Sequence, residues 1–591
     1  MNFFKTFLAA LLAVFASSII SGFIWIMIFV VAALSMESPA TVKNNSLLVI
    51  DFNEDITDTP VADPFSQVDF LTLDVHKTLS LYDALCAIDA AKDDDRIAGL
   101  YLRMDGPGTV SAASLEELRA AIDEFRAESG KFVVAYSESY SQGQYFLASA
   151  ADKVYIQPNG GFQWVGMNFN LMFYKGLFDK LGVKAEIFRP TACKYKSAVE
   201  PYFLTKMSDE NRRQMTDLAE SLWGNITEAV AESRGLTVEQ LNALADNLAV
   251  MLPEEALEAG LVDGMLYESE MDDIFDELGV EANKKGGHNM ISLATYASQV
   301  TPASLFASEK VGIIYAEGDI ADGSGKGLTI YAPQLVEKIR EAREDESIKA
   351  VVLRVNSPGG SALASDIIWH ELELLRAEKP LIVSMGAYAA SGGYYISAPA
   401  DAIVADKMTL TGSIGVFGMM FNAEKLLNDK LGVTFDGVTT NKYSDIGDMS
   451  RPMNAAERAA IMRGVDKVYD TFTGLVAEGR KLPIERVLDI AGGRVWSGEE
   501  AVAIGLADAN GGLREAIAVA ADKAALGEDF GIEELVDAPD GLAAIFAAVN
   551  ASVSERVMRS QLGDAFMQYN KLSEVLSRNG IQAYWPYVLE F

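Results

Sequence analysis

Short runs of apolar residues alternate with segments of helical periodicity along the first half of the chain. The apolar runs at 47–50, 99–103 and 132–135 predict buried strands, and the apolar spacing within 84–91 and 115–128 predicts helices between them. Strands that alternate with helices in this order are typical of a parallel sheet with right-handed helical crossovers. The pattern therefore predicts an α/β fold.

The same order of elements recurs in the second half. Apolar runs predict strands at 311–315, 350–354 and 381–384, and helical spacing predicts helices at 333–343 and 364–378. From residue 79 onwards, each predicted element lies about 250 residues after its counterpart. A period of this length makes each half large enough to be a domain.

Similar residues mark the same repeat. Residues 97–103 (IAGLYLR) correspond to residues 348–354 (IKAVVLR), and the sequence Lys-Leu-Gly-Val occurs at both 180–183 and 430–433. Agreement at ordered points with a nearly constant offset is the signature of an internal duplication. Small changes in the offset indicate short insertions, which belong in loops. We therefore predict two tandem βαβ repeats.

The duplication divides the chain into five parts. We predict a first repeat at 41–290, a linker at 291–309 and a second repeat at 310–540, preceded by an N-terminal anchor at 1–40. Residues 541–591 contain a helix-like apolar pattern and end in several aromatic residues. This composition favours a C-terminal helical segment that docks on the rest of the molecule.

Residues 6–36 form an apolar stretch without a charged side chain. A helix needs about 20 apolar residues to cross a bilayer, and the apolar core of a cleavable signal peptide is shorter, about 7–15 residues. We therefore predict one transmembrane helix that contacts membrane lipid through these residues. Lys5 precedes the stretch and acidic residues follow from Glu37, so the positive-inside rule exports everything after the helix.

Composition narrows the functional classes further. The 591 residues include 49 basic and 84 acidic side chains, and the resulting net charge of −35 disfavours binding to nucleic acid. Half of the residues are hydrophobic, which excludes a disordered chain. Two cysteines and three histidines disfavour a metal site or a histidine-based triad. Cys86 and Cys193 could pair in an oxidising compartment, but two separate buried thiols are the simpler interpretation.

The repeats differ at a turn of small residues. In the second repeat, Gly386-Ala-Tyr-Ala-Ala-Ser-Gly-Gly393 follows a predicted strand, and Gln142 of the first repeat stands at the position of Ser391. A serine at the start of a helix is often an N-cap. The same position can also expose a nucleophile to backbone N–H groups and to the positive end of the helix. Ser391 is thus the candidate nucleophile.

Paired glycines lie at the end of another predicted strand, in Asn356-Ser-Pro-Gly-Gly-Ser361. Glycines allow backbone N–H groups to approach a substrate carbonyl without interference from a side chain. An ordinary turn between strand and helix is the alternative. In the first repeat Thr109 replaces the second glycine, so only the second repeat has the means to attack a carbonyl.

A serine nucleophile needs a base. Lys194 matches Lys442 of the second repeat, but Lys196 has no lysine counterpart, because Ser444 stands at that position. His370 lies within a predicted helix, which favours packing or a surface role. Most lysines are solvated charges, but burial lowers the pKa of a lysine by up to about 3–5 units, enough for it to act as a base. Lys196 is the candidate base.

These features together resemble a known family. The anchor, the tandem repeats and four motifs are similar to those of the signal peptide peptidase A family in its long, two-repeat bacterial form. The motifs are Tyr195-Lys-Ser-Ala-Val-Glu-Pro201, Ser357-Pro-Gly-Gly-Ser361, Ala390-Ser-Gly-Gly-Tyr-Tyr395 and Leu410-Thr-Gly-Ser-Ile-Gly-Val-Phe-Gly418. The resemblance covers roughly residues 1–540.

The resemblance implies a Clp protease/crotonase-like fold and a serine endopeptidase without a metal or cofactor. It implies that Ser391 is the nucleophile of a Ser–Lys dyad, that Lys196 is the general base, and that Ser413 helps to orient the lysine. The resemblance assigns the oxyanion hole to backbone amides at Gly359, Gly360 and Gly392.

The resemblance also implies substrates, location and assembly. The substrates would be cleaved signal peptides and similar apolar peptides. The protein would reside in the inner membrane with its catalytic part on the periplasmic side, as a homo-oligomer for which we favour a tetramer. Three alternatives stay open: a crotonase-like acyl-transfer enzyme, a non-catalytic membrane scaffold, and a Ser–His–Asp esterase that uses His370.

Overall fold

The structure is a computed structural model that describes Phe15, Ser17 and residues 41–61, 68–69, 74–75, 78–106, 110–300, 307–325, 327–536 and 581–585. Nearly all of the predicted transmembrane helix and most of the predicted C-terminal segment lie outside these residues. Within the described ranges, no helix combines the length and the apolar character that a membrane crossing requires.

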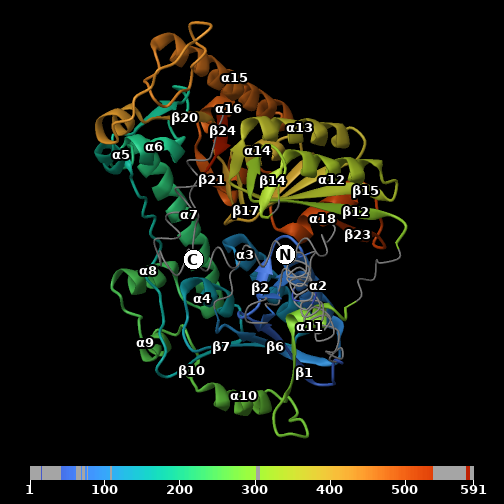
Figure 1. The fold of residues 1–591 in the computed structure, drawn as a ribbon. Coiled ribbons are helices and arrows are strands. Elements are labelled where there is room, and N and C mark those ends of the chain that lie inside the picture. Colours follow the sequence, from blue (N-terminus) through green and yellow to red (C-terminus); the bar gives the residue numbers. More distant parts are fainter. Residues whose placement is uncertain are drawn as a thin grey trace, which may run out of the picture.

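The first repeat is built on a six-stranded parallel sheet, seen at the bottom of Figure 1. In order across the sheet, its strands are β10 (Gly264–Met265), β8 (Lys153–Ile156), β7 (Phe132–Ser137), β6 (Ile97–Arg103), β1 (Ser46–Asp51) and β11 (Asn289–Ser292). The helices α2 (Leu81–Asp93) and α3 (Ala112–Ser129) connect successive strands. Ser80 and Ser111 begin these helices because each side chain accepts a backbone N–H of the first turn.

The second repeat has its own sheet of eight strands, at the upper right of Figure 1. Its main path runs through β21 (Val495–Ser497), β19 (Leu410–Gly412), β17 (Leu381–Ala390), β15 (Ile348–Ser357), β12 (Lys310–Glu317) and β23 (Gly531–Leu535). Beside β17 lies β18 (Ala402–Ala405), which pairs with β22 (Ala509–Asn510). The helices α12 (Ala332–Glu344) and α13 (Ala362–Arg376) are the crossovers. The predicted α/β fold with two repeats is confirmed.

The first repeat extends past residue 290. Strand β11 pairs in parallel with β1, just as β23 pairs in parallel with β12, so each sheet ends in a strand added beside the first one. The helix α11 (Leu293–Ala297) follows β11 and packs against β1 and α2. Residues 291–297, predicted above to begin a linker, therefore complete the first repeat.

A third sheet joins the two repeats. Its strands are β14 (Thr329–Tyr331), β13 (Asp319–Ala321), β16 (Gly359–Ser361), β24 (Ile581–Tyr584), β20 (Phe417–Asn422) and β9 (Lys184–Phe188). β9 comes from the first repeat, and it pairs antiparallel with β20 of the second. This pairing brings the segment after β9 to the second repeat.

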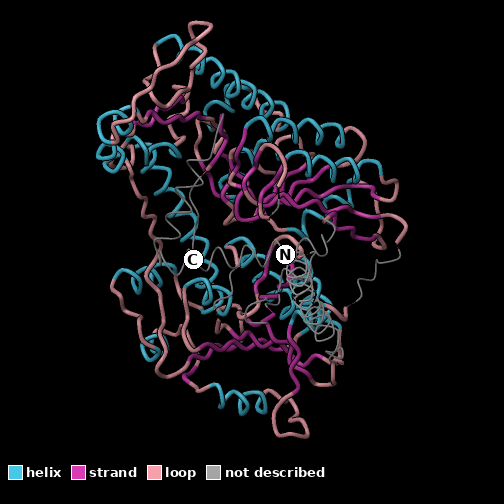
Figure 2. Tube along the Cα trace, viewed as in Figure 1, coloured by secondary structure: helices cyan, strands magenta, loops and turns pink. Residues whose placement is uncertain are grey.

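The remaining elements complete the layers around these sheets (Figure 2). In the first repeat they are β2 (Asp55–Thr57), β3 (Val68–Asp69), β4 (Asp74–Val75), β5 (Thr78–Ser80), α4 (Gln142–Ala148), α5 (Lys175–Leu181), η2 (Ser197–Val199), α6 (Glu200–Phe203), α7 (Asp209–Arg234), α8 (Val238–Asp246), α9 (Pro253–Glu258), η3 (Glu268–Glu270) and α10 (Met271–Glu277). In the second they are α14 (Gly392–Ser397), η4 (Leu426–Lys430), α15 (Ala455–Gly479), α16 (Ile484–Ile490), α17 (Gly498–Ile504) and α18 (Leu513–Lys523).

The central strands are buried on both faces, as expected of parallel sheets covered by helices. Eight of the ten residues of β15 are buried, and nine of the ten residues of β17 are buried. The long helix α7 packs against α4 and α8 of the first repeat and against β21 of the second, and Figure 1 shows it running between them. The carboxyl ends of β15 and β17, where the candidate residues begin, are therefore enclosed by both repeats.

Candidate active site

Ser391 lies between β17 and α14 in a strained backbone conformation. Its φ of 57° and ψ of −109° place a residue with a side chain in a region that favours glycine. The backbone N–H of Ser391 donates to the carbonyl of Gly412 at 2.8 Å, which holds the turn. The Ser391 side chain makes no capping hydrogen bond to α14, so the N-cap interpretation is wrong. The hydroxyl is directed elsewhere.

Lys196 reaches the Ser391 hydroxyl from the other repeat. Its Nζ lies 2.6 Å from Ser391 Oγ, 2.9 Å from Ser413 Oγ and 3.0 Å from the Ser413 carbonyl oxygen. The three residues are fully buried. Two of the residues that the sequence singles out in different repeats thus meet within one chain, and Ser413 joins them.

Burial lowers the pKa of the Lys196 amine to about 7. The charged form loses its hydration in this site, and among the residues that the structure describes no carboxylate hydrogen-bonds to Nζ to compensate. The same effect raises the pKa of the neighbouring Cys193 thiol to about 11. A substantial fraction of Lys196 is therefore an uncharged amine at neutral pH, and an uncharged amine can accept a proton.

The backbone around Lys196 is held by residues that the sequence analysis did not single out. The N–H of Tyr195 donates to the carbonyl of Gly492 at 3.0 Å, and the side-chain amide of Gln214 donates to the carbonyl of Tyr195 and to Ser197 Oγ. A Cβ on Gly493 would lie 2.6 Å from Lys196 Cβ, so only glycine permits this approach. The Gly492-Gly493 pair has no counterpart in the first repeat. This difference between the repeats is the sequence feature that could have pointed to these residues.

The paired glycines of β16 face the start of α14. Gly359 and Gly360 have φ values of 99° and 159°, and a Cβ on Gly359 would lie 2.5 Å from the backbone nitrogen of Gly392. The N–H of Gly359 donates to Ser357 Oγ at 3.1 Å. Gly359 therefore lies against the start of α14, and its amide has a partner in its own turn.

The model of peptidase family S49 matches residues 126–283 and 373–527, one segment in each repeat. The chain is 36% identical over 512 residues to "Protease 4" of Salmonella typhi, an alignment that covers 85% of this chain and 81% of that protein. It is 35% identical over 468 residues to "Serine protease SPPA, chloroplastic" of Arabidopsis thaliana, covering 78% of this chain and 68% of that one. The chain belongs to peptidase family S49.

The protein is therefore a serine protease of the two-repeat SppA type. The family model matches both halves separately, which confirms the internal duplication within the family. "Protease 4" of Haemophilus influenzae matches in the same way, with 35% identity over 458 residues that cover 75% of this chain and 73% of that protein. Each of these matches extends well beyond a single repeat.

The other candidates lie apart from the S49 site. His370 is exposed on α13, and Ser391 Oγ has Lys196 and the carbonyl of Gly415 as its hydrogen-bond partners. Lys194, two residues before the buried lysine, is exposed. Cys86 and Cys193 are free thiols, which confirms that they are separate, but only Cys193 is buried, and Cys86 is half-buried. Among the residues that the structure describes, no His, Cys, Asp or Glu cluster could hold a metal ion.

A buried ion network joins the repeats of this S49 protein behind the glycine turn. The Asp58 carboxylate of the first repeat accepts hydrogen bonds from Arg354, the shortest at 2.7 Å, and from Asn356 at 2.8 Å. Arg354 also donates to Glu117 and to Ser384, each within 2.8 Å. Arg354 and Asn356 lie on β15 and Ser384 on β17, so the network ties together the two strands that lead to the site.

Proposed function

We propose that the protein is a serine endopeptidase in which Ser391 is the nucleophile and Lys196 is the general base. The observation that carries the proposal is the 2.6 Å contact between Lys196 Nζ and Ser391 Oγ in a fully buried setting. Burial lowers the pKa of Lys196 to about 7, which suits a general base at neutral pH. The complementary loss of the serine from one repeat and of the lysine from the other supports the same assignment.

The proposed reaction proceeds through an acyl-enzyme. Ser391 Oγ attacks the peptide carbonyl while the neutral amine of Lys196 takes the hydroxyl proton. Lys196 then returns this proton to the leaving amine, and water hydrolyses the ester. The Ser413 hydroxyl and carbonyl, at 2.9 and 3.0 Å from Nζ, would keep the lone pair of the amine directed at Ser391.

The backbone amides of Gly360 and Gly392 would stabilise the oxyanion. Each such donor is worth about 10²–10³ in rate when it is aimed at the developing charge. The family resemblance also assigns Gly359 to the oxyanion hole. Since its N–H already donates to Ser357 Oγ, we assign Gly359 a supporting part: its lack of a side chain leaves room for the Gly392 amide.

The finer assignments follow from the family resemblance. We propose that the substrates are apolar peptides, including cleaved signal peptides, and that the fold is of the Clp protease/crotonase class. We propose that residues 6–36 anchor the chain in the inner membrane with the catalytic part outside the cytoplasm. We further propose that the protein works as a homo-oligomer, and we favour a tetramer. A relative from Enterococcus faecium has the name "Putative signal peptide peptidase SppA", and this name supports the substrate class.

Covalent labelling tests the proposed nucleophile. A fluorophosphonate should label the full-length protein in detergent at Ser391, located by peptide mass analysis, and Ser391→Ala should lose both the label and peptide hydrolysis. Ser397→Ala is the matched control, because Ser397 is buried on the same short helix and its hydroxyl donates only to Gly393. Hydrolysis by folded Ser391→Ala above about a thousandth of wild type would overturn the assignment.

A further inference from the structure

One face of the long helix α7 carries three polar side chains that contact the second repeat. Gln214, Asp217 and Ser221 are three and four residues apart, so they lie on the same side of the helix. We call these three residues the α7 seam. Their partners, in the same order, lie in and just before β21: the Val495 N–H at 3.4 Å, the Arg494 guanidinium at 2.8 Å and the Ser497 hydroxyl at 2.8 Å.

Gln214 also holds the turn that carries Lys196. Its Nε2 donates to the Tyr195 carbonyl at 3.1 Å and to Ser197 Oγ at 3.0 Å. Tyr195 and Ser197 flank Lys196 in the sequence, so one side chain holds the residues on both sides of the candidate base. Gln214 is only 1% exposed, and water therefore does not compete for these hydrogen bonds.

The segment that receives the α7 seam holds Ser413 as well. The N–H of Ser413 donates to the Arg494 carbonyl at 2.7 Å, and its hydroxyl lies 3.4 Å from the Gly493 carbonyl oxygen. Val495, whose N–H is bonded to Gln214, is the next residue. Gln214 thus connects the turn of Lys196 directly to the segment that places the Ser413 hydroxyl and carbonyl around Nζ.

Gln214 is a neutral contact among charged and titratable groups. Asp217 and Arg494 form an ion pair, and the Arg494 guanidinium lies 5.5 Å from the centre of the Tyr195 ring. Arg189 donates to the Lys196 carbonyl at 2.9 Å. The Cys193 thiol is uncharged at neutral pH, because burial raises its pKa to about 11. A charge introduced at Gln214 would therefore act on the base from a buried position.

We propose that Gln214 is a positioning residue for the general base: it fixes the Lys196 turn against residues 493–495 so that Nζ reaches Ser391 Oγ. The inference rests on the proposed function and adds to it a residue that acts through Lys196. A displacement of the base by about 1 Å can cost about 10²-fold in rate. A loosened turn would also allow water to reach the amine.

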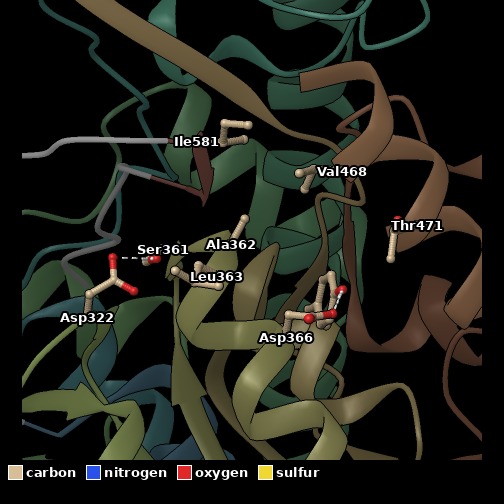
Figure 3. A pocket seen from close by; sticks show the side chains of 9 residues that line it. Asp322, Ser361, Ala362, Leu363, Asp366, Val468, Thr471 and Ile581 are labelled. Carbon is tan, nitrogen blue, oxygen red and sulfur yellow. Dashed lines mark hydrogen bonds between the residues drawn. The ribbon is translucent and has the colours of Figure 1, made fainter. Parts of the chain in front are cut away.

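Peptide binding should depend little on Gln214. The cavity that adjoins β16 and α14 has a volume of about 360 Å³ and a mainly apolar lining (Figure 3). Its lining residues belong to the second repeat and to β24, and they include Leu363, Tyr395 and Ile581. Gln214 lies on α7 of the first repeat, on the side of the base. A substitution there should therefore change kcat and leave KM nearly constant.

Gln214→Met removes the hydrogen bonds and keeps the length of the side chain. For the full-length protein in detergent, hydrolysis of a short apolar peptide should show kcat lowered about 10–100-fold, with KM within about twofold of wild type. The midpoint of the pH profile of kcat/KM should rise by about one unit above its value near 7, because water at the amine restores part of the hydration of its charged form.

Ser221→Ala is the matched control. Ser221 belongs to the same seam, but its hydrogen bond is to Ser497, two residues beyond Val495. Its kcat and its pH midpoint should equal those of wild type. A midpoint that rises equally in Ser221→Ala would overturn the inference, because the effect would then belong to the contact between the repeats in general.

Gln214→Glu covers the case in which the methionine variant does not fold. Glutamate has the shape of glutamine and can still accept the Val495 N–H, but its carboxylate cannot donate to the Tyr195 carbonyl. A negative charge near Lys196 favours the protonated amine, so the uncharged base forms at higher pH and the midpoint should again rise.

Three results with these variants would overturn the inference. The first is a folded Gln214→Met or Gln214→Glu protein with the kcat and pH midpoint of wild type. The second is a lower kcat and a lower Tm with an unchanged midpoint, which is what a purely structural role produces. The third is failure of both variants to fold, since Gln214 would then serve the fold as a whole.

Failure of the inference can be distinguished from failure of the proposed function. If a fluorophosphonate does not label Ser391 and Ser391→Ala hydrolyses peptides like wild type, the proposed function fails, and Gln214 has no base to position. If labelling and hydrolysis depend on Ser391 while Gln214→Met keeps the wild-type kcat and midpoint, the inference alone fails.

Discussion

Lys196→Met should make the protein more stable at neutral pH while it abolishes hydrolysis. Methionine has nearly the length of the lysine side chain and carries no charge, so it fills the same buried space. The lysine has an ordinary pKa of 10.5, and burial lowers it to about 7. The unfolded chain keeps its lysine charged and hydrated, so folding at pH 7 requires this group to give up its proton or its hydration.

The size of the effect follows from the two pKa values. At 1.36 kcal/mol for each unit of pKa, the difference between 10.5 and about 7 corresponds to roughly 5 kcal/mol. The variant loses the contacts of Nζ, but the hydroxyls of Ser391 and Ser413 keep carbonyl oxygens at 3.5 and 3.4 Å, so this loss is about 1–2 kcal/mol. The net gain at pH 7 is therefore about 3 kcal/mol, or roughly 3–6 °C in Tm.

The gain must shrink as pH rises. Between pH 7 and pH 10.5 the unfolded wild-type chain binds more protons than the folded one, so the free energy of unfolding of wild type increases with pH relative to the variant. Thermal unfolding of both proteins, followed by tryptophan fluorescence at pH 6.5, 8 and 9.5, should show the largest difference at pH 6.5. At pH 9.5 the difference should be close to zero.

Lys194→Met is the control for this experiment. Lys194 is exposed, so its replacement should produce no difference in Tm that depends on pH in this range. A Lys196→Met protein that is less stable than wild type at pH 7, or a difference that stays constant up to pH 9.5, would refute the argument that burial holds Lys196 uncharged.

Three further predictions concern the candidate site and the buried ion network beside it. Lys196→Arg should be as inactive as Lys196→Ala in peptide hydrolysis, since arginine stays protonated. The kcat/KM of wild type should rise with pH around a midpoint near 7, and a kcat/KM that falls with pH while the protein stays folded would contradict this. Asp58→Ala leaves Arg354 buried with one fewer carboxylate, which should destabilise the protein by about 3–5 kcal/mol in denaturant unfolding, and unchanged stability would show that the network is dispensable. Mixed inactive Ser391→Ala and Lys196→Ala chains should stay inactive after subunit exchange, because the two residues meet within one chain; recovered activity would place the dyad between subunits.

Much of the architecture follows from local patterns in the sequence. Apolar runs of strand length and helical spacing between them predict β6, β7, α2 and α3 with boundaries only a few residues from those observed. Burial on both faces makes parallel strands continuously apolar, and this is a local property that a sequence displays directly. The duplication strengthens these predictions because each element is predicted independently from the two repeats.

The candidate residues could be found for a different reason. In a duplicated chain the two repeats can be compared with each other. Ser391 then differs from Gln142 at the matching position, and Lys196 differs from Ser444. That comparison cannot measure distance. The contact between the two side chains depends on β9 joining the sheet of the second repeat, and strand pairing between distant segments has no local signature.

The sequence by itself thus determined the α/β repeats, the chemistry of the candidate residues and their division between the two halves. The tertiary structure decided which groups meet: the burial that lowers the pKa of Lys196, the approach that Gly493 permits, and the place of Asp58 behind the glycine turn. It also decided that Ala583, near the end of the chain, lies beside Gly360. Periodicity and composition act over a few neighbouring residues, whereas desolvation and hydrogen-bond partners depend on segments brought together only when the whole chain folds.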